Sequence, residues 1–469
     1  MTTVKTNTLA RTLTLVPATA LLVTNVIGVG VFMKARVMTC NVGSPWLVLL
    51  AYAVAGVFTI AGALTFAELG ALMPRAGGMY NFIGAAFGRV WAFLYGWVVT
   101  LIDAAASNAA LAIVFAIFFN GVIGATLPPG VSKLVAVGAI VAVTLLGLAR
   151  IRTNGHFATV LTILKIVVVG GIGLAAFAFG DGSLRHFAES GAAGTCENVA
   201  ATARLGLAGF GAAIIGALWS FTGWSIITYV AEEIQAPEKT LPRALISGSV
   251  ILTALYLLAN AGYFYVLTPE EVASVPESSS VAGEVLIRLI GAGGVALMAA
   301  GLMASSFGSM HAGMVTQTRM AYAMARDGLL PRSLATVSER ARVPTHAVIL
   351  VGICASAFAL SGTFDVITDL VVFVLLLFNG LAVASIYVLR RKLPDAPRPF
   401  RMWGYPVVPA LYLGATIYLM INTLLATPGR ALAGIGVVAL GLPVYFYYAR
   451  RLPAARLEDW LAAKAQGGP

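Results

Sequence analysis

Twelve runs of mostly apolar residues follow one another along the chain, and their length limits its fold more than any other feature. A helix of about 20 residues crosses the hydrocarbon core of a bilayer. In lipid a backbone must satisfy its own polar groups, which an α-helix does. The sequence therefore predicts an all-α membrane protein with twelve transmembrane helices. We expect them near 14–34, 45–68, 89–120, 131–149, 157–180, 206–231, 243–267, 290–320, 345–362, 367–389, 405–427 and 431–449.

Composition supports this class. Of the 469 residues, 59% are hydrophobic and 10% are charged, whereas soluble domains carry about 25% charged residues. The polar start runs directly into a full-length span, which is not the pattern of a cleaved signal peptide. The net charge of +11 follows from where the loops lie and does not indicate a nucleic-acid partner.

The distribution of Lys and Arg predicts the orientation. With the N-terminus in the cytoplasm, the inner segments hold 21 of them and the outer segments 7, Lys34 and Arg36 among the latter. Such a bias places both ends inside. We therefore expect a multi-pass protein of the cytoplasmic (inner) membrane, with cytoplasmic tails at 1–13 and 450–469.

The cysteines Cys40, Cys196 and Cys354 are scattered, without a CxxC or metal-ligand spacing. A disulfide between Cys40 and Cys196, across two expected outer loops, is the less favoured of two interpretations. We expect no metal and no cofactor.

Two of the spans carry residues that weaken a helix. The first contains "TNVIGVGVF", with an Asn and the glycines Gly28 and Gly30. The sixth contains "LWSFTGWSIITYVAEE", with hydroxyl side chains around Gly223. The two lie five spans apart, and interrupted helices at corresponding positions of two repeats mark the substrate site of many transporters. The alternative is that the glycines serve close helix packing.

An interrupted helix in a membrane exposes backbone groups that must line a cavity or meet a ligand. The N–H groups that begin the second half-helix suit a carboxylate. Free carbonyl groups at the end of the first half suit an ammonium group. A zwitterionic amino acid carries both.

Several segments resemble the amino acid–polyamine–organocation superfamily. "NVIGVGVF" resembles its first-helix motif, and "FAELGALMPRAGGMYNFIGAAFG" resembles its second-helix end and re-entrant loop. "GWSIITYVAEEIQAPEKTLPRALI" resembles the sixth helix of L-type amino acid transporters and their bacterial relatives. "FGSMHAG", "AMARDGLLP" and "VLRRKLPDAPRPFRMWGYP" resemble the eighth helix, its exit and the loop before the eleventh. The match runs in order through nearly the whole chain.

This resemblance implies the LeuT-type fold, with two inverted five-helix repeats whose first and sixth helices are broken. The repeats would cover 14–180 and 206–389, and 405–449 would add helices eleven and twelve. It also implies amino acid transport, often by exchange.

The resemblance also implies a substrate site between the breaks at Val26–Gly30 and Trp219–Ser225. The amides of Gly28, Val29 and Gly30 would hold the carboxylate. Carbonyl groups near Val26, Trp219 and Thr222 would take the amine, with Trp219 as an aromatic gate over the substrate. The stretch from Trp219 to Ser225 also includes Gly223. The chain departs from the pattern at Val29, where a Ser is usual, and at His311, where Asn or Gly is frequent.

Lys165 lies in the fifth span. Placing a lysine in the centre of a membrane-spanning helix costs about 2.5–3.5 kcal/mol, so its side chain should face the helix bundle and not the lipid. Its position resembles a lysine of sodium-independent members, whose ammonium group replaces a sodium ion between the first and eighth helices. Ser305, Ser306 and Ser309 are candidate oxygen partners. A proton-coupling role, or a side chain that reaches the inner interface, are the alternatives.

Asp103 lies near the middle of the third span, one helical turn from Ser107. By resemblance to the superfamily's arginine/agmatine exchanger it would face the pocket. It could then pair with a cationic substrate or carry a proton. A purely structural contact is the alternative.

Three other groups have structural interpretations. Arg319 is expected to pair with Glu68, Glu232 or Glu233 as an inner latch, or to reach the interface. His311 is expected to make a helix–helix contact. Phe221, Trp224 and Asn379 are pocket or packing residues.

No nucleophile elbow, HExxH motif or phosphate-binding loop is present, so we do not expect an enzyme. We predict a sodium-independent secondary active transporter of amino acids that works by alternating access, with exchange as the expected mode. A proton-coupled permease for cationic amino acids or polyamines is the alternative. A membrane amino acid sensor is the alternative of another class. The sequence specifies neither the substrate side chain nor a partner subunit.

Overall fold

The computed structural model describes residues 9–125, 127–191, 193–276, 279–291, 293–361, 364–426 and 428–450. Up to the middle of the chain, the α-helices are α1 (Leu15–Val26), α2 (Gly30–Val42), α3 (Pro45–Leu72), α4 (Met79–Phe87), α5 (Arg89–Val98), α6 (Ala104–Ile123), α7 (Pro129–Gly147), α8 (Ile151–Phe179) and α9 (Gly206–Ser220). Beyond it they are α10 (Pro237–Val266), α11 (Pro269–Ser274), α12 (Val281–Ile290), α13 (Gly293–Arg326), α14 (Thr345–Ser361), α15 (Phe364–Lys392), α16 (Val407–Ala426), α17 (Pro428–Ala439) and α18 (Gly441–Ala449).

Short helical segments complete the fold. One π-helical turn, η1 (Val99–Asp103), joins α5 to α6. The 3-10 helices are η2 (Leu184–Ala188), η3 (Ala201–Ala203), η4 (Trp224–Glu233) and η5 (Arg332–Ala335).

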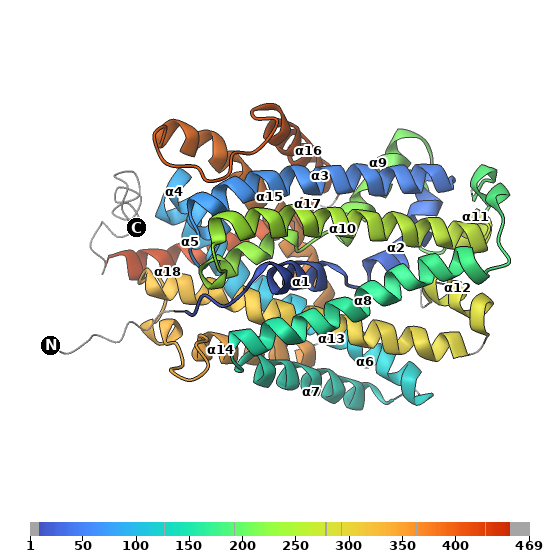
Figure 1. Cartoon of the computed structure of the whole chain (residues 1–469), viewed down its shortest axis with the longest axis horizontal. Helices are drawn as coiled ribbons and strands as arrows, with labels where there is room; N and C mark the ends of the chain where they lie inside the picture. The colour runs from blue at the N-terminus through green and yellow to red at the C-terminus, as the bar shows by residue number, and fades with distance from the viewer. Residues whose placement is uncertain are drawn as a thin grey trace.

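The helices form an all-α bundle in which most long helices run roughly along one axis (Figure 1). Within the described residues, nine helical segments are long and apolar enough to cross a membrane, and the bent pair α1–α2 makes a tenth. Two shorter apolar helices, Thr345–Ser361 and Val407–Ile421, lie at the expected ninth and eleventh spans. The chain is thus a multi-pass membrane protein, and the number twelve stays a prediction.

Small residues bring these helices close together. A Cβ added at Gly262 of α10 would lie 2.9 Å from the Cα of Gly173 in α8. A Cβ at Gly56 of α3 would lie 2.4 Å from the side chain of Thr253 in α10. Because lipid supplies no hydrophobic drive between helices, such close backbone packing is a main source of association in membranes.

The first expected span is interrupted where the sequence predicts. Helix α1 ends at Val26, α2 begins at Gly30, and their axes differ by 44°. Ile27 leaves helical geometry with ψ 86°, and the Gly28 amide turns back to the Val26 carbonyl at 2.7 Å.

The sixth expected span is also interrupted. Helix α9 ends at Ser220 and η4 begins at Trp224. Gly223 between them has φ +103°, a left-handed conformation that glycine adopts without steric cost. Both breaks named from the sequence are confirmed.

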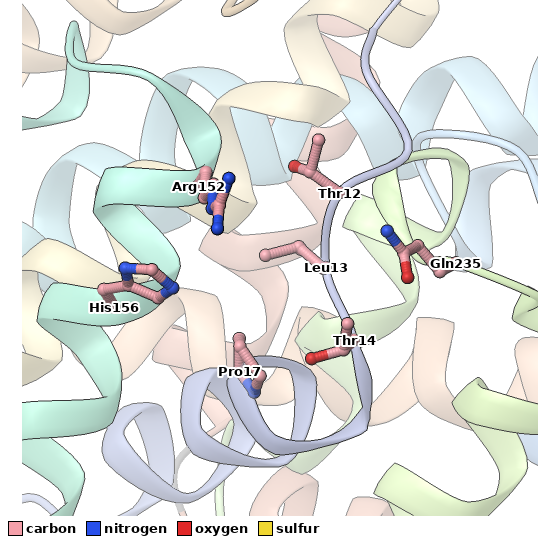
Figure 2. A pocket seen from close by; sticks show the side chains of 7 residues that line it. All are labelled: Thr12, Leu13, Thr14, Pro17, Arg152, His156 and Gln235. Atoms are coloured by element: carbon pink, nitrogen blue, oxygen red, sulfur yellow. The ribbon is translucent and has the colours of Figure 1, made fainter.

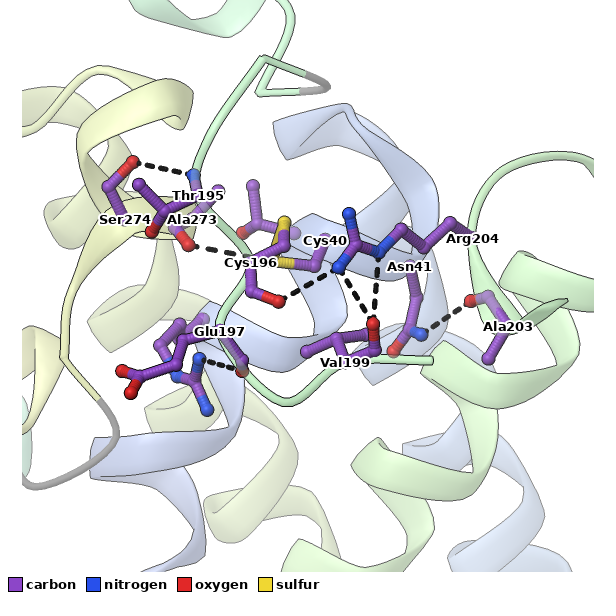
Figure 3. Close-up of a disulfide and its surroundings, with 12 residues drawn as sticks. Cys40, Asn41, Thr195, Cys196, Glu197, Val199, Ala203, Arg204, Ala273 and Ser274 are labelled. Carbon is purple, nitrogen blue, oxygen red and sulfur yellow. Dashed lines mark hydrogen bonds between the residues drawn. A yellow bond between two sulfur atoms is a disulfide. The ribbon is translucent and has the colours of Figure 1, made fainter. Parts of the chain in front are cut away.

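One end of the bundle, called the disulfide end here, carries α11 and a disulfide between Cys40 and Cys196 (Figure 3). The less favoured of the two interpretations of Cys40 and Cys196 is therefore the correct one. Cys40 belongs to α2 and Cys196 to the segment between α8 and α9, so the bridge joins residues 156 positions apart, a pairing that no local spacing indicates. The Cys196 amide also donates to the Ala273 carbonyl at 3.2 Å.

Helix α2 is longer than the sequence predicts. The expected first span ended at 34, because two cations interrupt the apolar run. The helix instead continues to Val42, so Lys34 and Arg36 lie on α2 and not in an outer loop. Arg36 is 6% exposed and donates to the Glu197 carbonyl at 2.8 Å.

The other end, called the terminal end, carries the described start of the chain near Leu9 and the end of α18 (Figure 1). The greater part of both expected tails, 1–8 and 451–469, lies outside the described residues.

Candidate functional site

The carbonyl groups freed at the first break are held by Lys165 of α8. Its ammonium Nζ donates to the Thr24 and Ile27 carbonyls, both at 2.5 Å, and to Ser309 Oγ at 2.8 Å. The side chain is 4% exposed, so it faces the bundle and does not reach the interface. Lys165 therefore joins the end of α1 to α13.

Two of the three candidate serines take part. Ser309 Oγ donates to the Thr24 carbonyl at 3.0 Å, and Ser305 Oγ donates to the Ile27 carbonyl at 3.0 Å. Ser306 does not, since its hydroxyl bonds to the Leu302 carbonyl of its own helix at 2.9 Å.

The two breaks are tied directly to each other by Tyr256, which the sequence did not single out, and by Asn25, the Asn noted in the first span. Tyr256 of α10 donates its hydroxyl to the Ser220 carbonyl at 2.9 Å and contacts the Val26 carbonyl at 3.3 Å. The Asn25 side-chain amide donates to the Gly223 carbonyl at 3.1 Å. The carbonyl ends of α1 and α9 thus share one buried hydroxyl.

Gly30 lies against the second break. A Cβ added there would stand 2.8 Å from Ser220 Oγ and 3.1 Å from Cζ3 of Trp219. Gly28 is different, since a Cβ there would meet only the Val26 carbonyl at 3.9 Å. Close packing therefore requires glycine at Gly30 and leaves room at Gly28.

The start of α2 offers unpaired donors. Val29 is the N-cap residue and its side chain makes no cap hydrogen bond. Among the described residues no acceptor pairs with the amides of Val29, Gly30 or Val31. The first N–H groups of a helix lack partners within the helix and attract anions.

The second break presents a mixed surface. Trp219 is 48% exposed and Thr222 is exposed, whereas Ser225 is 7% exposed. The Ser225 carbonyl accepts the Thr228 hydroxyl at 2.7 Å. Of this group, Trp219 and Thr222 are therefore the exposed side chains.

Asp103 and Ser107 lie apart from the breaks in the hydrogen-bond network. Ser107 Oγ donates to Asp103 Oδ1 at 3.2 Å, and the Gln317 amide of α13 donates to Asp103 Oδ2 at 3.1 Å. Both donors are neutral. Among the described residues, no hydrogen bond connects Asp103 or Ser107 to Val26–Gly30 or Trp219–Ser225, so their contact with substrate stays a prediction.

Ion pairs hold the terminal end. Arg319 and Glu233 are fully buried and form two hydrogen bonds, at 2.7 and 3.1 Å, which confirms the expected pairing. Arg326 contacts Glu232 at 2.7 Å. Truncating one partner of a buried pair costs about 3–5 kcal/mol, because a charge is left unpaired.

The start of the chain joins this region. The amides of Thr12 and Leu13 donate to the Glu233 carbonyl at 3.0 Å, and the Gln235 amide returns a bond to Leu13 at 2.8 Å. Figure 2 shows the segment Thr12–Thr14 between Gln235 and the α8 side chains Arg152 and His156, beside a pocket of about 410 Å³. This pocket lies at the terminal end, and neither break lines it.

Of the remaining candidates, His311, Phe221 and Trp224 make structural contacts. His311 Nε2 lies 3.0 Å from Asn154 Oδ1, which confirms a helix–helix contact. The Phe221 ring packs on Tyr256, and the Trp224 ring packs on Phe66 with centroids 5.0 Å apart.

Comparisons with known proteins show which family the chain resembles. The amino acid permease family model matches residues 13–444. The serine/threonine exchanger of Bacillus subtilis is 27% identical over 95% of this chain and 98% of its own length. The human cystine/glutamate transporter is 31% identical over 94% of this chain and 85% of its own length. The mouse large neutral amino acids transporter small subunit 2 is 29% identical over 92% of this chain and 80% of its own length.

These relatives are transporters and not enzymes, and the matches extend over both breaks and Lys165. The chain belongs to the amino acid permease family of the amino acid–polyamine–organocation superfamily, and its function is amino acid transport across a membrane.

Proposed function

We propose that this permease is a sodium-independent amino acid exchanger of the cytoplasmic membrane that works by alternating access. Its substrate would bind between the breaks at Val26–Gly30 and Trp219–Ser225. The finding that carries this proposal is the contact set of Lys165, which joins the first break to α13.

We infer that the Lys165 ammonium group takes the place of a sodium ion at the first break. Hard cations such as sodium prefer carbonyl and hydroxyl oxygens. The ammonium Nζ is already bonded to two carbonyl groups and one hydroxyl. A side-chain cation at this place stabilises the break without an ion from solution, so no sodium gradient would drive transport.

The carboxylate end of a zwitterion matches donors that remain unpaired, and its ammonium end matches carbonyl groups at the two breaks. The unpaired amides at the start of α2 suit the α-carboxylate. The α-ammonium would bind carbonyl oxygens at the ends of α1 and α9, where Tyr256 now lies. Trp219, which is 48% exposed, would cover the bound substrate.

We also propose the number and arrangement of the transmembrane helices. Twelve helices would comprise two inverted repeats of five, 14–180 and 206–389, followed by two more helices in 405–449. The positions of the two breaks, in the first and sixth expected spans, support this division.

We also propose that the terminal end faces the cytoplasm. With Lys34 and Arg36 moved onto α2, the expected outer segments keep 7 − 2 = 5 cations against 21 inside. The disulfide at the opposite end fits an oxidising compartment outside the cytoplasm.

One observation favours a second candidate, a proton-coupled permease for cationic amino acids or polyamines. The Asp103 carboxylate has two neutral donors and, among the described residues, no cation as a partner. An intramembrane carboxylate is costly unless it binds a proton or a positive charge. A bound proton or a cationic substrate would both neutralise it.

The test is uptake of a panel of radiolabelled amino acids into proteoliposomes in sodium-free buffer, with and without internal amino acid. Uptake that requires internal amino acid supports the exchanger. Uptake into empty vesicles under an imposed pH gradient supports the proton-coupled permease instead. Saturable binding without uptake of any substrate would support a sensor and contradict both.

A further inference from the structure

Lys34 lies beside the proposed substrate site and has no role in it so far. It follows Gly30 by four residues on α2, which is one helical turn or about 6 Å along the axis. Its ammonium Nζ lies 4.6 Å from the ring centroid of Trp219. Gly30 packs against the same ring. Trp219 therefore spans the distance between Gly30 and Lys34.

Lys34 is a cation without an anion. Among the described residues, no Asp or Glu side chain lies within ion-pair distance of its Nζ, since the ion pairs lie elsewhere. The nearest charged neighbour on α2 is Arg36, another cation, which binds the Glu197 carbonyl. Charged side chains inside a membrane face the bundle or an aqueous cavity and are usually paired.

The donors of Lys34 are also free. An ammonium group has three N–H donors and no acceptor. The Lys34 ammonium group makes a cation–π contact with the face of the Trp219 ring, and this contact involves no oxygen or nitrogen acceptor. No hydrogen bond from Lys34 Nζ is present within the described part of the chain. The half-buried ammonium beside the exposed Trp219 is thus available to a ligand.

The distance between Lys34 and the start of α2 indicates which kind of amino acid would bind. The Gly28 amide is already bonded to the Val26 carbonyl, so the amides of Val29 and Gly30 are the ones free for the α-carboxylate. If they hold it, then Lys34 lies one helical turn farther toward the disulfide end. That turn is within the reach of a short acidic side chain. We propose that Lys34 binds the side-chain carboxylate of an acidic amino acid, so that aspartate or glutamate is a substrate. This inference rests on the proposed amino acid transport.

Lys34 and Asp103 favour substrates of opposite side-chain charge. Asp103 hydrogen-bonds to Gln317 of α13, and Lys34 stacks on Trp219 of α9, so the two charges belong to different parts of the bundle. Asp103 favours a cationic substrate and Lys34 an anionic one. Comparing two substrates that differ only in side-chain charge tests whether Lys34 determines the preference.

The test compares L-glutamate with L-glutamine, which are nearly isosteric. Exchange is measured in proteoliposomes for the wild type, Lys34→Gln and Lys34→Arg. Lys133→Gln is the matched control, because Lys133 is also expected on the outer side and bonds to the Leu360 carbonyl far from the site. We expect Lys34→Gln to raise the KM for glutamate at least tenfold and to leave that for glutamine within twofold. Lys34→Arg should stay close to the wild type.

Two results would overturn the inference. A wild type that exchanges glutamine but not glutamate would show that Lys34 does not select acidic substrates. An equal rise in both KM values for Lys34→Gln would make Lys34 a positioning residue for Trp219. Thermal stabilisation of the purified protein by glutamate and by glutamine tests Lys34 without transport. If no amino acid is transported but glutamate alone stabilises the wild type and not Lys34→Gln, the proposed function fails and the binding inference stands.

Discussion

At both breaks the interrupted helix leaves backbone carbonyl groups without their helical partners, and different donors bind them at each break. At the first, the freed carbonyl groups of Thr24 and Ile27 bind a charged ammonium from Lys165. At the second, the Ser220 and Gly223 carbonyls bind neutral donors, the Tyr256 hydroxyl and the Asn25 amide. Hydrogen bonds from charged donors contribute about 1.5–3 kcal/mol and neutral ones about 0.5–1.5 kcal/mol.

This difference indicates which break depends on a cation. A break that binds a charge can be held by a sodium ion or by a lysine, and here it is held by the lysine. The second break needs no ion, because neutral donors and a left-handed glycine hold its shape. Substitutions at the two breaks should therefore impair transport in different ways.

Gly30→Ala should have the largest effect among the neutral changes. The added Cβ would stand 2.8 Å from Ser220 Oγ and push the breaks apart. Crowding of this kind costs about 1–3 kcal/mol, so we expect exchange to fall about tenfold to a hundredfold. The measurement is initial uptake per reconstituted molecule.

Gly28→Ala is the paired control, because the structure has room for its Cβ. Its thermal stability should match the wild type. If uptake nevertheless falls, the substrate itself approaches Gly28. Equal effects of the two substitutions on stability would show that the contrast between the glycines is wrong.

Tyr256→Phe should have an intermediate effect. It removes the hydroxyl that contacts Val26 and Ser220 and leaves two buried carbonyl groups without this donor. A buried group without its partner costs about 1–3 kcal/mol. We expect a lower thermal midpoint and about a tenfold loss of exchange, with no appearance of sodium dependence. Sodium-stimulated uptake in this variant would contradict the distinction between the breaks.

Asp103→Asn should have the smallest effect on neutral substrates, because Asp103 bonds to neither break. Uptake of a neutral amino acid should change less than about threefold, because the Asn oxygen can accept one of the two bonds and its NH₂ group can donate to the Ser107 hydroxyl in place of the other. Comparing uptake at several pH values for neutral and cationic substrates tests the remaining role. A variant with the wild-type pH profile and substrate preference would make Asp103 structural.

The sequence predicted the helices well where apolar length alone decides them. It placed both breaks, because a glycine and polar residues occur together in two spans at corresponding positions of two repeats. It failed at α2, which continues through Lys34 and Arg36 to Val42. Hydropathy ends a span at a charge, whereas these charges are accommodated by Trp219 and the Glu197 carbonyl.

The site shows the same limit. Lys165 could be identified because a lysine in a span is rare and resembles a known position. Tyr256 and Gln317 could not, because a tyrosine or glutamine in a span carries no signal of its partner. Tyr256 meets Val26 across 230 residues, and Cys40 meets Cys196 across 156. Contacts of such separation are determined by the packing of the whole bundle.

The most direct test of the account is exchange by the wild type and by Lys165→Ala in sodium-free buffer, at equal amounts of folded protein. Lys239→Ala, a change in an expected inner segment, controls for the loss of a positive charge. We predict sodium-independent exchange by the wild type and by Lys239→Ala, and almost none by Lys165→Ala. Exchange by Lys165→Ala at the wild-type rate, or a wild type that works only with sodium, would contradict the role of Lys165.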